Sequence, residues 1–122
     1  YFNYIYVRMG ACTFIHKRTA DDIWKNLFEL PLVETDRDLS EEEFLSSVSF
    51  RSLMAEGEIP EVRSVLRNVK HVLSHRVIYA NFYEVVLPEN SRSFSKYQCI
   101  GMEDLEQYPV SRLVHAFLEK YV

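Results

Sequence analysis

The feature that most constrains the fold is a pair of β-strand patterns separated by a short polar turn. Val77–Leu87 alternates between two sets of side chains along its length, and the shorter run Val69–Leu73 precedes it across the turn Ser74–Arg76. A period of two is typical of β-strands, because successive side chains point to opposite faces of a sheet. The pattern therefore predicts two strands joined by an exposed turn.

Further patterns predict two helices and more strands. Ser40 and Glu43 have the spacing of a capping box, in which each side chain accepts from the other's backbone N–H, so a helix is expected to begin at Ser40. Apolar residues at helical spacing from Val110 to Tyr121 predict a C-terminal helix. The order of strands, helix, strands and helix is typical of an α+β domain, with helices packed on a mixed or antiparallel sheet. Additional strands are expected at Tyr1–Arg8, Cys12–Lys17 and Tyr97–Ile100.

Length and charge bound the class of protein. A chain of 122 residues makes one ordinary domain, so residues 1–122 are treated as a single unit. Its net charge of −4 opposes nonspecific binding to nucleic acid, which depends on basic side chains. The charge is uneven, because Glu34–Glu61 holds nine acidic and two basic residues, whereas Val62–Arg76 holds four basic and no acidic residues. The basic segment is either a solvated face or a surface that contacts phosphates around the turn.

The sequence carries no signature of a known catalytic centre or metal site. It lacks a nucleophile elbow, a zinc-protease helix, a phosphate-binding loop and a dinucleotide fingerprint. Cys12 and Cys99 are far apart and lack metal-ligand spacing, so we interpret them as free thiols buried in strands, with the question whether they meet left open. The longest apolar runs are about half of what a membrane helix needs, and no membrane contact is expected.

Three segments, in order along the chain, form motifs that together cover almost its whole length. Trp24–Pro31 reads Trp-Lys-Asn-Leu-Phe-Glu-Leu-Pro, Lys70–Arg76 reads Lys-His-Val-Leu-Ser-His-Arg, and Leu105–Leu118 leads through a Pro into the C-terminal helix. The first two resemble the motifs Trp-x-x-Leu-Trp-Glu-Phe-Pro and Lys-His-x-Phe-Ser-His of the A/G-specific adenine DNA glycosylase (MutY) family. The third resembles that family's C-terminal stretch. The resemblance implies a Nudix-like fold and recognition of 8-oxoguanine opposite the adenine that the glycosylase removes.

The resemblance also implies roles for residues of the turn. Ser74 would read the oxidised edge of the base, Leu73 would wedge beside the lesion, and His75 would position the turn or contact the DNA backbone. Leu73 stands where the family often has Phe, which keeps an apolar wedge and removes ring stacking. Three basic residues are predicted from their charge, rather than from the motif, to contact phosphates: Arg67, Lys70 and Arg76.

The family's catalytic half is missing from these residues. Two distant cysteines cannot ligate its iron–sulfur cluster, so no cofactor is expected in this fragment and the cluster is expected in the missing catalytic domain. The chain begins at Tyr1 inside a predicted strand, which suggests a piece of a longer glycosylase. The fragment alone is expected to be non-catalytic, with lesion-bearing double-stranded DNA and the catalytic domain of the same chain as its partners. A cytoplasmic, bacterial and nucleoid-associated protein is implied.

Two other functions stay open. One is a Nudix-type hydrolase of oxidised nucleotides, which would need the motif Gly-x5-Glu-x7-Arg-Glu-x-x-Glu-Glu-x-Gly, because its carboxylates bind the metals that activate water. No Arg-Glu pair occurs in this sequence, and Glu41–Glu43 suit the positive end of a helix dipole without any catalytic role. The other is a protein-interaction module, suggested by the net negative charge, the aromatic content and the acidic segment Glu34–Glu61.

Overall fold

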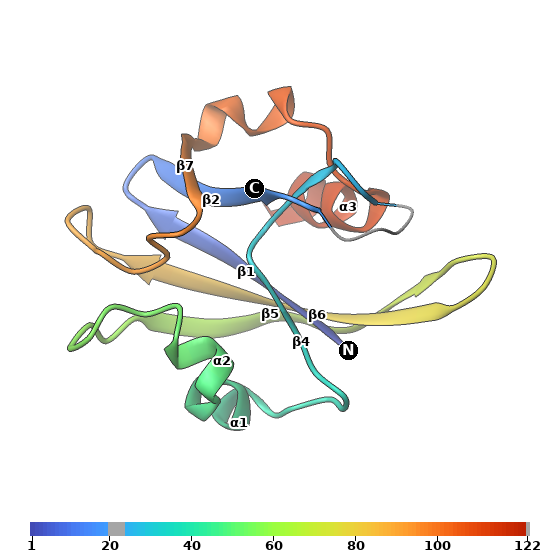
Figure 1. Ribbon diagram of the computed structural model, residues 1–122, viewed down its shortest axis with the longest axis horizontal. Coiled ribbons are helices and arrows are strands. Elements are labelled where there is room, and N and C mark those ends of the chain that lie inside the picture. Colours follow the sequence, from blue (N-terminus) through green and yellow to red (C-terminus); the bar gives the residue numbers. More distant parts are fainter. Residues whose placement is uncertain (20–23, 122) are drawn as a thin grey trace.

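The structure is a computed structural model that describes residues 1–19 and 24–121. Within this part of the chain, seven strands form one mixed sheet with helices on both faces (Figure 1). The strands are β1 (Phe2–Met9), β2 (Cys12–Lys17), β3 (Phe28–Glu29), β4 (Leu32–Glu34), β5 (Glu61–Val72), β6 (Val77–Leu87) and β7 (Gln98–Gly101). The helices are α1 (Glu41–Ser46), α2 (Val48–Arg51), the 3-10 helix η1 (Met102–Gln107) and α3 (Arg112–Tyr121).

The sheet is mixed because its two central strands run parallel. The strand order is β3-β2-β1-β6-β5, with β4 paired to β1 and β7 paired to β2. β1 pairs with β6 in parallel over its whole length, from Phe2 opposite Ala80 to Met9 opposite Leu87. The other strand pairs, including the long β5–β6 hairpin, are antiparallel. The expected α+β fold with a mixed sheet between helices is confirmed.

Alternation along the central strands builds a separate core on each face of the sheet. Tyr4 and Tyr6 of β1 belong to the core beneath α3, whereas Ile5 and Val7 belong to the core beneath α1 and α2. Aromatic rings join helix to sheet in both layers. On the α3 side, Phe117 stacks on Phe82 with ring centroids 4.3 Å apart and an interplanar angle of 5°. Burial of both faces explains why β1 is apolar at nearly every position.

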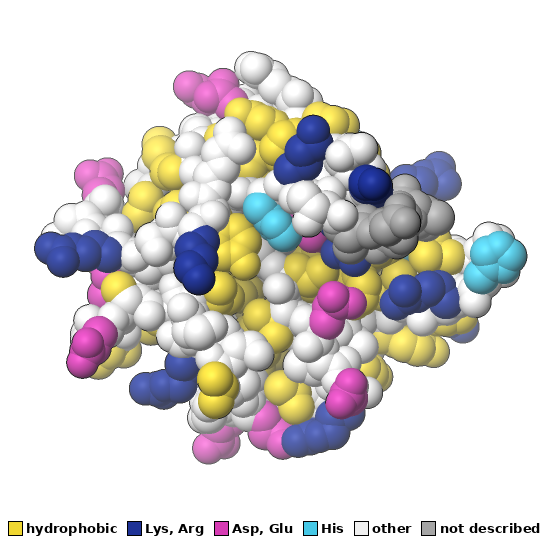
Figure 2. Space-filling model, in the orientation of Figure 1, with side chains coloured by type: hydrophobic (Ala, Val, Ile, Leu, Met, Phe, Trp, Pro, Cys, Tyr) yellow, Lys and Arg dark blue, Asp and Glu magenta, His cyan; other side chains and the backbone are white. Residues whose placement is uncertain are grey.

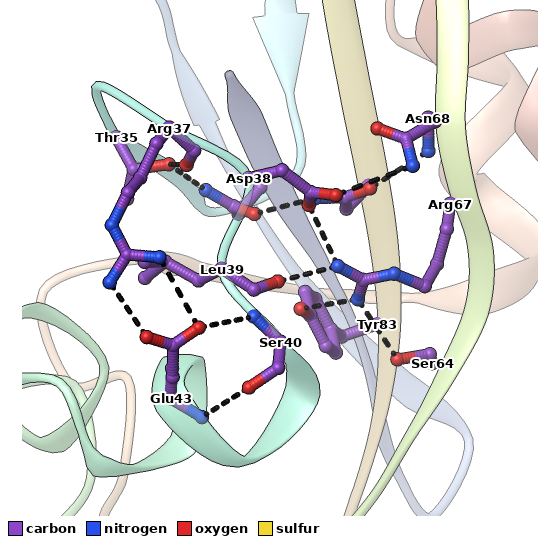
Figure 3. A network of polar contacts seen from close by, with 12 residues as sticks. Thr35, Arg37, Asp38, Leu39, Ser40, Glu43, Ser64, Arg67, Asn68 and Tyr83 are labelled. Atoms are coloured by element: carbon purple, nitrogen blue, oxygen red, sulfur yellow. Dashed lines mark hydrogen bonds and ion pairs between the residues drawn. The ribbon is translucent and has the colours of Figure 1, made fainter.

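The capping box predicted at Ser40 is present and sets the start of α1. The Ser40 N–H donates to Glu43 Oε1 at 3.0 Å, and the Glu43 N–H donates to Ser40 Oγ at 3.1 Å. Arg37 adds an ion pair, with its Nη2 2.6 Å from Glu43 Oε2 (Figure 3). The bonds from Arg37 and Ser40 lower the pKa of Glu43 from its ordinary value to about 2. The Glu43 side chain therefore caps the start of α1.

This arrangement predicts an acid-sensitive helix start. A carboxyl whose pKa is lowered by folding adds stability that is complete above its ordinary pKa and is lost as the pH falls towards 2. We expect an NMR titration to give Glu43 a pKa close to 2, and Arg37→Ala to move it up towards the ordinary value. Arg51→Ala, which changes an exposed Arg of α2, should leave the titration of Glu43 unchanged. An ordinary pKa for Glu43 in the unsubstituted chain would contradict the arrangement.

The structure corrects the expected boundaries in the middle of the chain. β5 begins at Glu61 rather than at Val69, and β4 and η1 had no sequence signal. The first half of β5 was not predicted from the periodicity of its side chains, because the β5–β6 register shifts between Ser64 and Leu66 and again between Leu66 and Val69. Such irregularities break the alternation of buried and exposed side chains. Among the described residues, no helix is long and apolar enough to cross a membrane.

Candidate functional site

The turn between β5 and β6 lies at the end of a hairpin that projects beyond the rest of the sheet (Figure 1). The last ladder pair is Val72 opposite Val77, and the Leu73 N–H donates to the Arg76 carbonyl at 2.8 Å, which closes the turn. Ser74 and His75 lie inside this loop and are both exposed. The structure therefore presents a hydroxyl and an imidazole together on a backbone that the hairpin fixes.

Leu73 lies differently from its two neighbours. Its side chain is half-buried and packs against the core on the α3 side of the sheet. The alternation of β5 explains this position, because Val69 packs against the same core, whereas Val72 is 66 % exposed. Leu73 thus anchors one side of the turn to the body of the domain.

Two of the three predicted phosphate contacts are exposed on this hairpin. Lys70, opposite Tyr79 in the ladder, is exposed, and so is Arg76 at the end of the turn. The Arg76 guanidinium also lies over the ring of Phe2, 5.8 Å from its centroid. Figure 2 shows Lys, Arg and His side chains at the projecting end of the molecule. The positive charge at this end is thus available to solvent, although the whole chain is negative.

Arg67, the third predicted phosphate contact, also lies on β5, but its side chain is engaged within the protein. Its guanidinium lies 2.7 Å from Asp38 Oδ1, donates to the Leu39 carbonyl and donates at 3.0 Å to the Tyr83 hydroxyl (Figure 3). Burial raises the pKa of Tyr83, although the hydrogen bond from Arg67 opposes this shift. These contacts tie the start of α1 to the sheet. The structure therefore separates Arg67 from Lys70 and Arg76, and its role here is to hold two layers together.

A cluster of rings and cations supports the base of the hairpin. Trp24, 8 % exposed, contacts Phe2 edge to face with centroids 5.8 Å apart, and its ring lies 6.3 Å from that of His71 on β5. The Arg18 guanidinium lies over the rings of Phe2 and Trp24 and pairs with the buried Glu29. A cation over an aromatic face is attracted by the negative charge of the ring. The Trp24–Pro31 motif includes one member of this cluster, Trp24, but the sequence analysis did not identify Phe2 and Arg18 as its other members.

Comparison with known protein families assigns the chain. A family model described as NUDIX domain matches residues 3–120, which is nearly the whole chain. The chain belongs to the NUDIX domain family. No curated protein sequence matches it. The match supports the Nudix-like part of the resemblance, and it does not by itself distinguish a lesion-reading domain from a NUDIX hydrolase.

Two carboxylates at the start of α1 are engaged within the protein. Glu43 is held by Arg37 and Ser40, and Glu41 accepts the backbone N–H of Ser64 on the edge strand β5. In residues 1–19 and 24–121, no group of three or more His, Cys, Asp or Glu side chains is placed to hold a metal ion. The acidic helix start is therefore used for capping α1 and for covering an edge of the sheet.

The two cysteines are placed differently from the expectation. Cys99 is exposed and Cys12 is half-buried, so the prediction of two buried thiols was wrong. Both cysteines are free, and burial together with the neighbouring Cys12 raises the pKa of the Cys99 thiol. The two residues, 87 positions apart in the sequence, lie on neighbouring strands because β2 pairs with β7 in the sheet.

Proposed function

We propose that this NUDIX domain recognises 8-oxoguanine opposite adenine in duplex DNA, as the lesion-reading domain of an A/G-specific adenine DNA glycosylase. The observation that carries the proposal is the projecting hairpin, which presents Ser74 and His75 on the same hairpin as the exposed Lys70 and Arg76. The Lys-His-Val-Leu-Ser-His motif coincides with this turn. The engagement of Glu41 and Glu43 within the protein favours a binding role over metal-dependent hydrolysis.

The chemistry of the lesion suits a hydroxyl. Guanine offers an acceptor at N7 in the major groove, whereas 8-oxoguanine offers an N7–H donor beside a new carbonyl acceptor. The Ser74 hydroxyl has one donor and two acceptor lone pairs, so it can accept from N7–H and donate to the carbonyl. With guanine it can only donate to N7. Discrimination then follows from a second hydrogen bond that only the oxidised base completes.

The remaining residues divide between anchoring and electrostatics. Leu73 fixes the turn through the core and offers its outer edge to the neighbouring base, which is a smaller wedge than the family's usual Phe. Lys70 and Arg76 contact phosphates, and His75 positions the turn or contacts the DNA backbone. Arg67 is left out of the interface because its donors are engaged by Asp38, Leu39 and Tyr83.

In this proposal the domain itself cleaves no bond. Adenine removal, base flipping and the iron–sulfur cluster belong to the catalytic domain of the same protein, which is the second partner of this surface. Because the chain carries a net charge of −4 and a single small interface, we expect weak binding by the domain alone. A protein with this role works on the chromosome, which in a bacterial cell is the nucleoid.

The decisive experiment is an NMR titration of the labelled chain. One duplex contains 8-oxoguanine opposite adenine and the other contains guanine at the same position. We expect larger shifts at Ser74 and His75 with the lesion, and roughly 10-fold tighter binding, the size of one or two hydrogen bonds. Ser74→Ala should remove this preference, whereas Ser46→Ala, which changes an exposed Ser of α1, should keep it.

Two outcomes would contradict the proposal. The lesion-reading role would be contradicted if the unsubstituted chain bound both duplexes equally and Ser74→Ala had no effect on adenine removal by the whole glycosylase. Metal-dependent release of pyrophosphate from an oxidised nucleoside triphosphate would favour the hydrolase, a function that the family match accommodates. A protein partner lost on changing the acidic segment Glu34–Glu61, with DNA binding unaffected, would favour an interaction module.

A further inference from the structure

The two cysteines occupy a diagonal position on one face of the β2–β7 pair. In this antiparallel ladder Cys12 lies opposite Gly101, and Cys99 lies opposite Phe14. Residues directly opposite each other share a face, and residues two apart on a strand share it too. Cys12 and Cys99 are therefore diagonal neighbours, and Gly101 contributes no side chain between them.

The thiols are close and accessible. Burial, and then the neighbouring Cys12 side chain, raise the pKa of the Cys99 thiol above its ordinary value, as expected for two thiols on one face of the β2–β7 pair. Cys99 is exposed, so an oxidant reaches it from solvent, and Cys12 is half-buried directly beside it. An oxidised Cys99 would therefore find its reaction partner in place.

We propose that Cys12 and Cys99 form a reversible intramolecular disulfide when a peroxide oxidises Cys99. In the first step the Cys99 sulfur attacks hydrogen peroxide, the O–O bond breaks, and sulfenic acid and water form. In the second step the Cys12 sulfur attacks the Cys99 sulfur, an S–S bond replaces the S–O bond, and a second water leaves. Two thiols and one peroxide thus give one disulfide and two waters.

The sheet allows the small movement that this bond needs. A disulfide joins Cα atoms about 4.4–6.8 Å apart, whereas diagonal neighbours are about 7–8 Å apart. Among the described strands, β7 pairs with β2 alone and has four residues, so the movement that closes this gap would disturb only one strand pair. The bond would join β2 to β7, just before η1, where the Met102 N–H already donates to the Ala11 carbonyl at 2.8 Å.

The chain is suited to a direct test because Cys12 and Cys99 are its two cysteines. After hydrogen peroxide treatment, we expect thiol titration to fall from two groups to none and the intact mass of the monomer to fall by two hydrogens. Dithiothreitol should reverse both changes. Peptide mapping should join the Cys12 and Cys99 peptides, and the oxidised chain should melt at a higher temperature. Cys12→Ser and Cys99→Ser should each abolish the mass loss.

Other products would overturn the proposal. A gain of oxygen atoms on Cys99 with Cys12 still a free thiol would show that the pair does not close. A covalent dimer as the main product would show that Cys99 reacts between molecules faster than with Cys12. This proposal is independent of the DNA-reading role, because β7 and the β5–β6 turn lie at different ends of the domain (Figure 1).

Discussion

Replacing Asn81 by Ala is expected to lower the free energy of unfolding by about 3 kcal/mol, a large effect for removal of one polar side chain. Asn81 is fully buried on β6. Its Nδ2 donates to Asn3 Oδ1 at 3.2 Å and to Asp38 Oδ1 at 2.9 Å, and its Oδ1 accepts the Asn68 N–H at 2.8 Å. The substitution would remove these bonds and leave the Asn68 N–H and the buried Asn3 short of a partner, which costs more than the bonds themselves contribute.

Urea unfolding followed by circular dichroism would measure this loss. Asn90→Ala provides the matched control, because Asn90 is exposed in the loop after β6 and should change stability by less than about 0.5 kcal/mol. If Asn81→Ala is as stable as Asn90→Ala, the network is not a determinant of the fold. We also expect Asn81→Ala to weaken the contact between α1 and the sheet, since Asp38 bonds to both Asn81 and Arg67.

The Asn81 network shows where prediction from sequence stops. Alternation along β6 placed Asn81 on a defined face, and the boundaries Val77–Leu87 were predicted correctly. The pattern could not show that Asn3, Asp38 and Asn68, from three other segments, converge on this side chain. Strand and cap signals are local, whereas the partners of a buried polar group depend on how the whole chain folds.

The residues of the candidate site differ in the same way, since some have local sequence signals and others depend on the whole fold. The turn at Ser74 was predicted because a polar break between two β-patterns is a local signal. The position of the Arg67 side chain was not predicted, because charge alone does not distinguish a cation paired with Asp38 from one that faces solvent. Irregularity of β5 adds to the difficulty, since Asn68 has a φ of 54° next to a register shift, and a strict period of two does not hold there.

Replacing Phe44 by Ala is expected to cost about 4 kcal/mol of the free energy of unfolding, the largest loss among our predictions. Phe44 has no exposed surface and is the buried residue of α1. Its ring stacks on Tyr83 with centroids 4.3 Å apart at 15°, and lies 5.2 Å from the ring of Phe50. Ala would leave a cavity beneath a helix of six residues, which is too short to hold its place without this packing.

A matched control lies in the adjoining helix. Val48 on α2 is 85 % exposed, so Val48→Ala should leave stability within about 0.5 kcal/mol. Loss of α1 in Phe44→Ala would also release Glu41 from the Ser64 N–H, and would uncover part of the edge strand β5. Exposed edges pair with other chains, so we expect this variant to aggregate on warming where Val48→Ala does not. Hydrogen exchange at the Ser64 amide gives a direct measure, because unchanged protection in Phe44→Ala would show that β5 is covered by something other than α1.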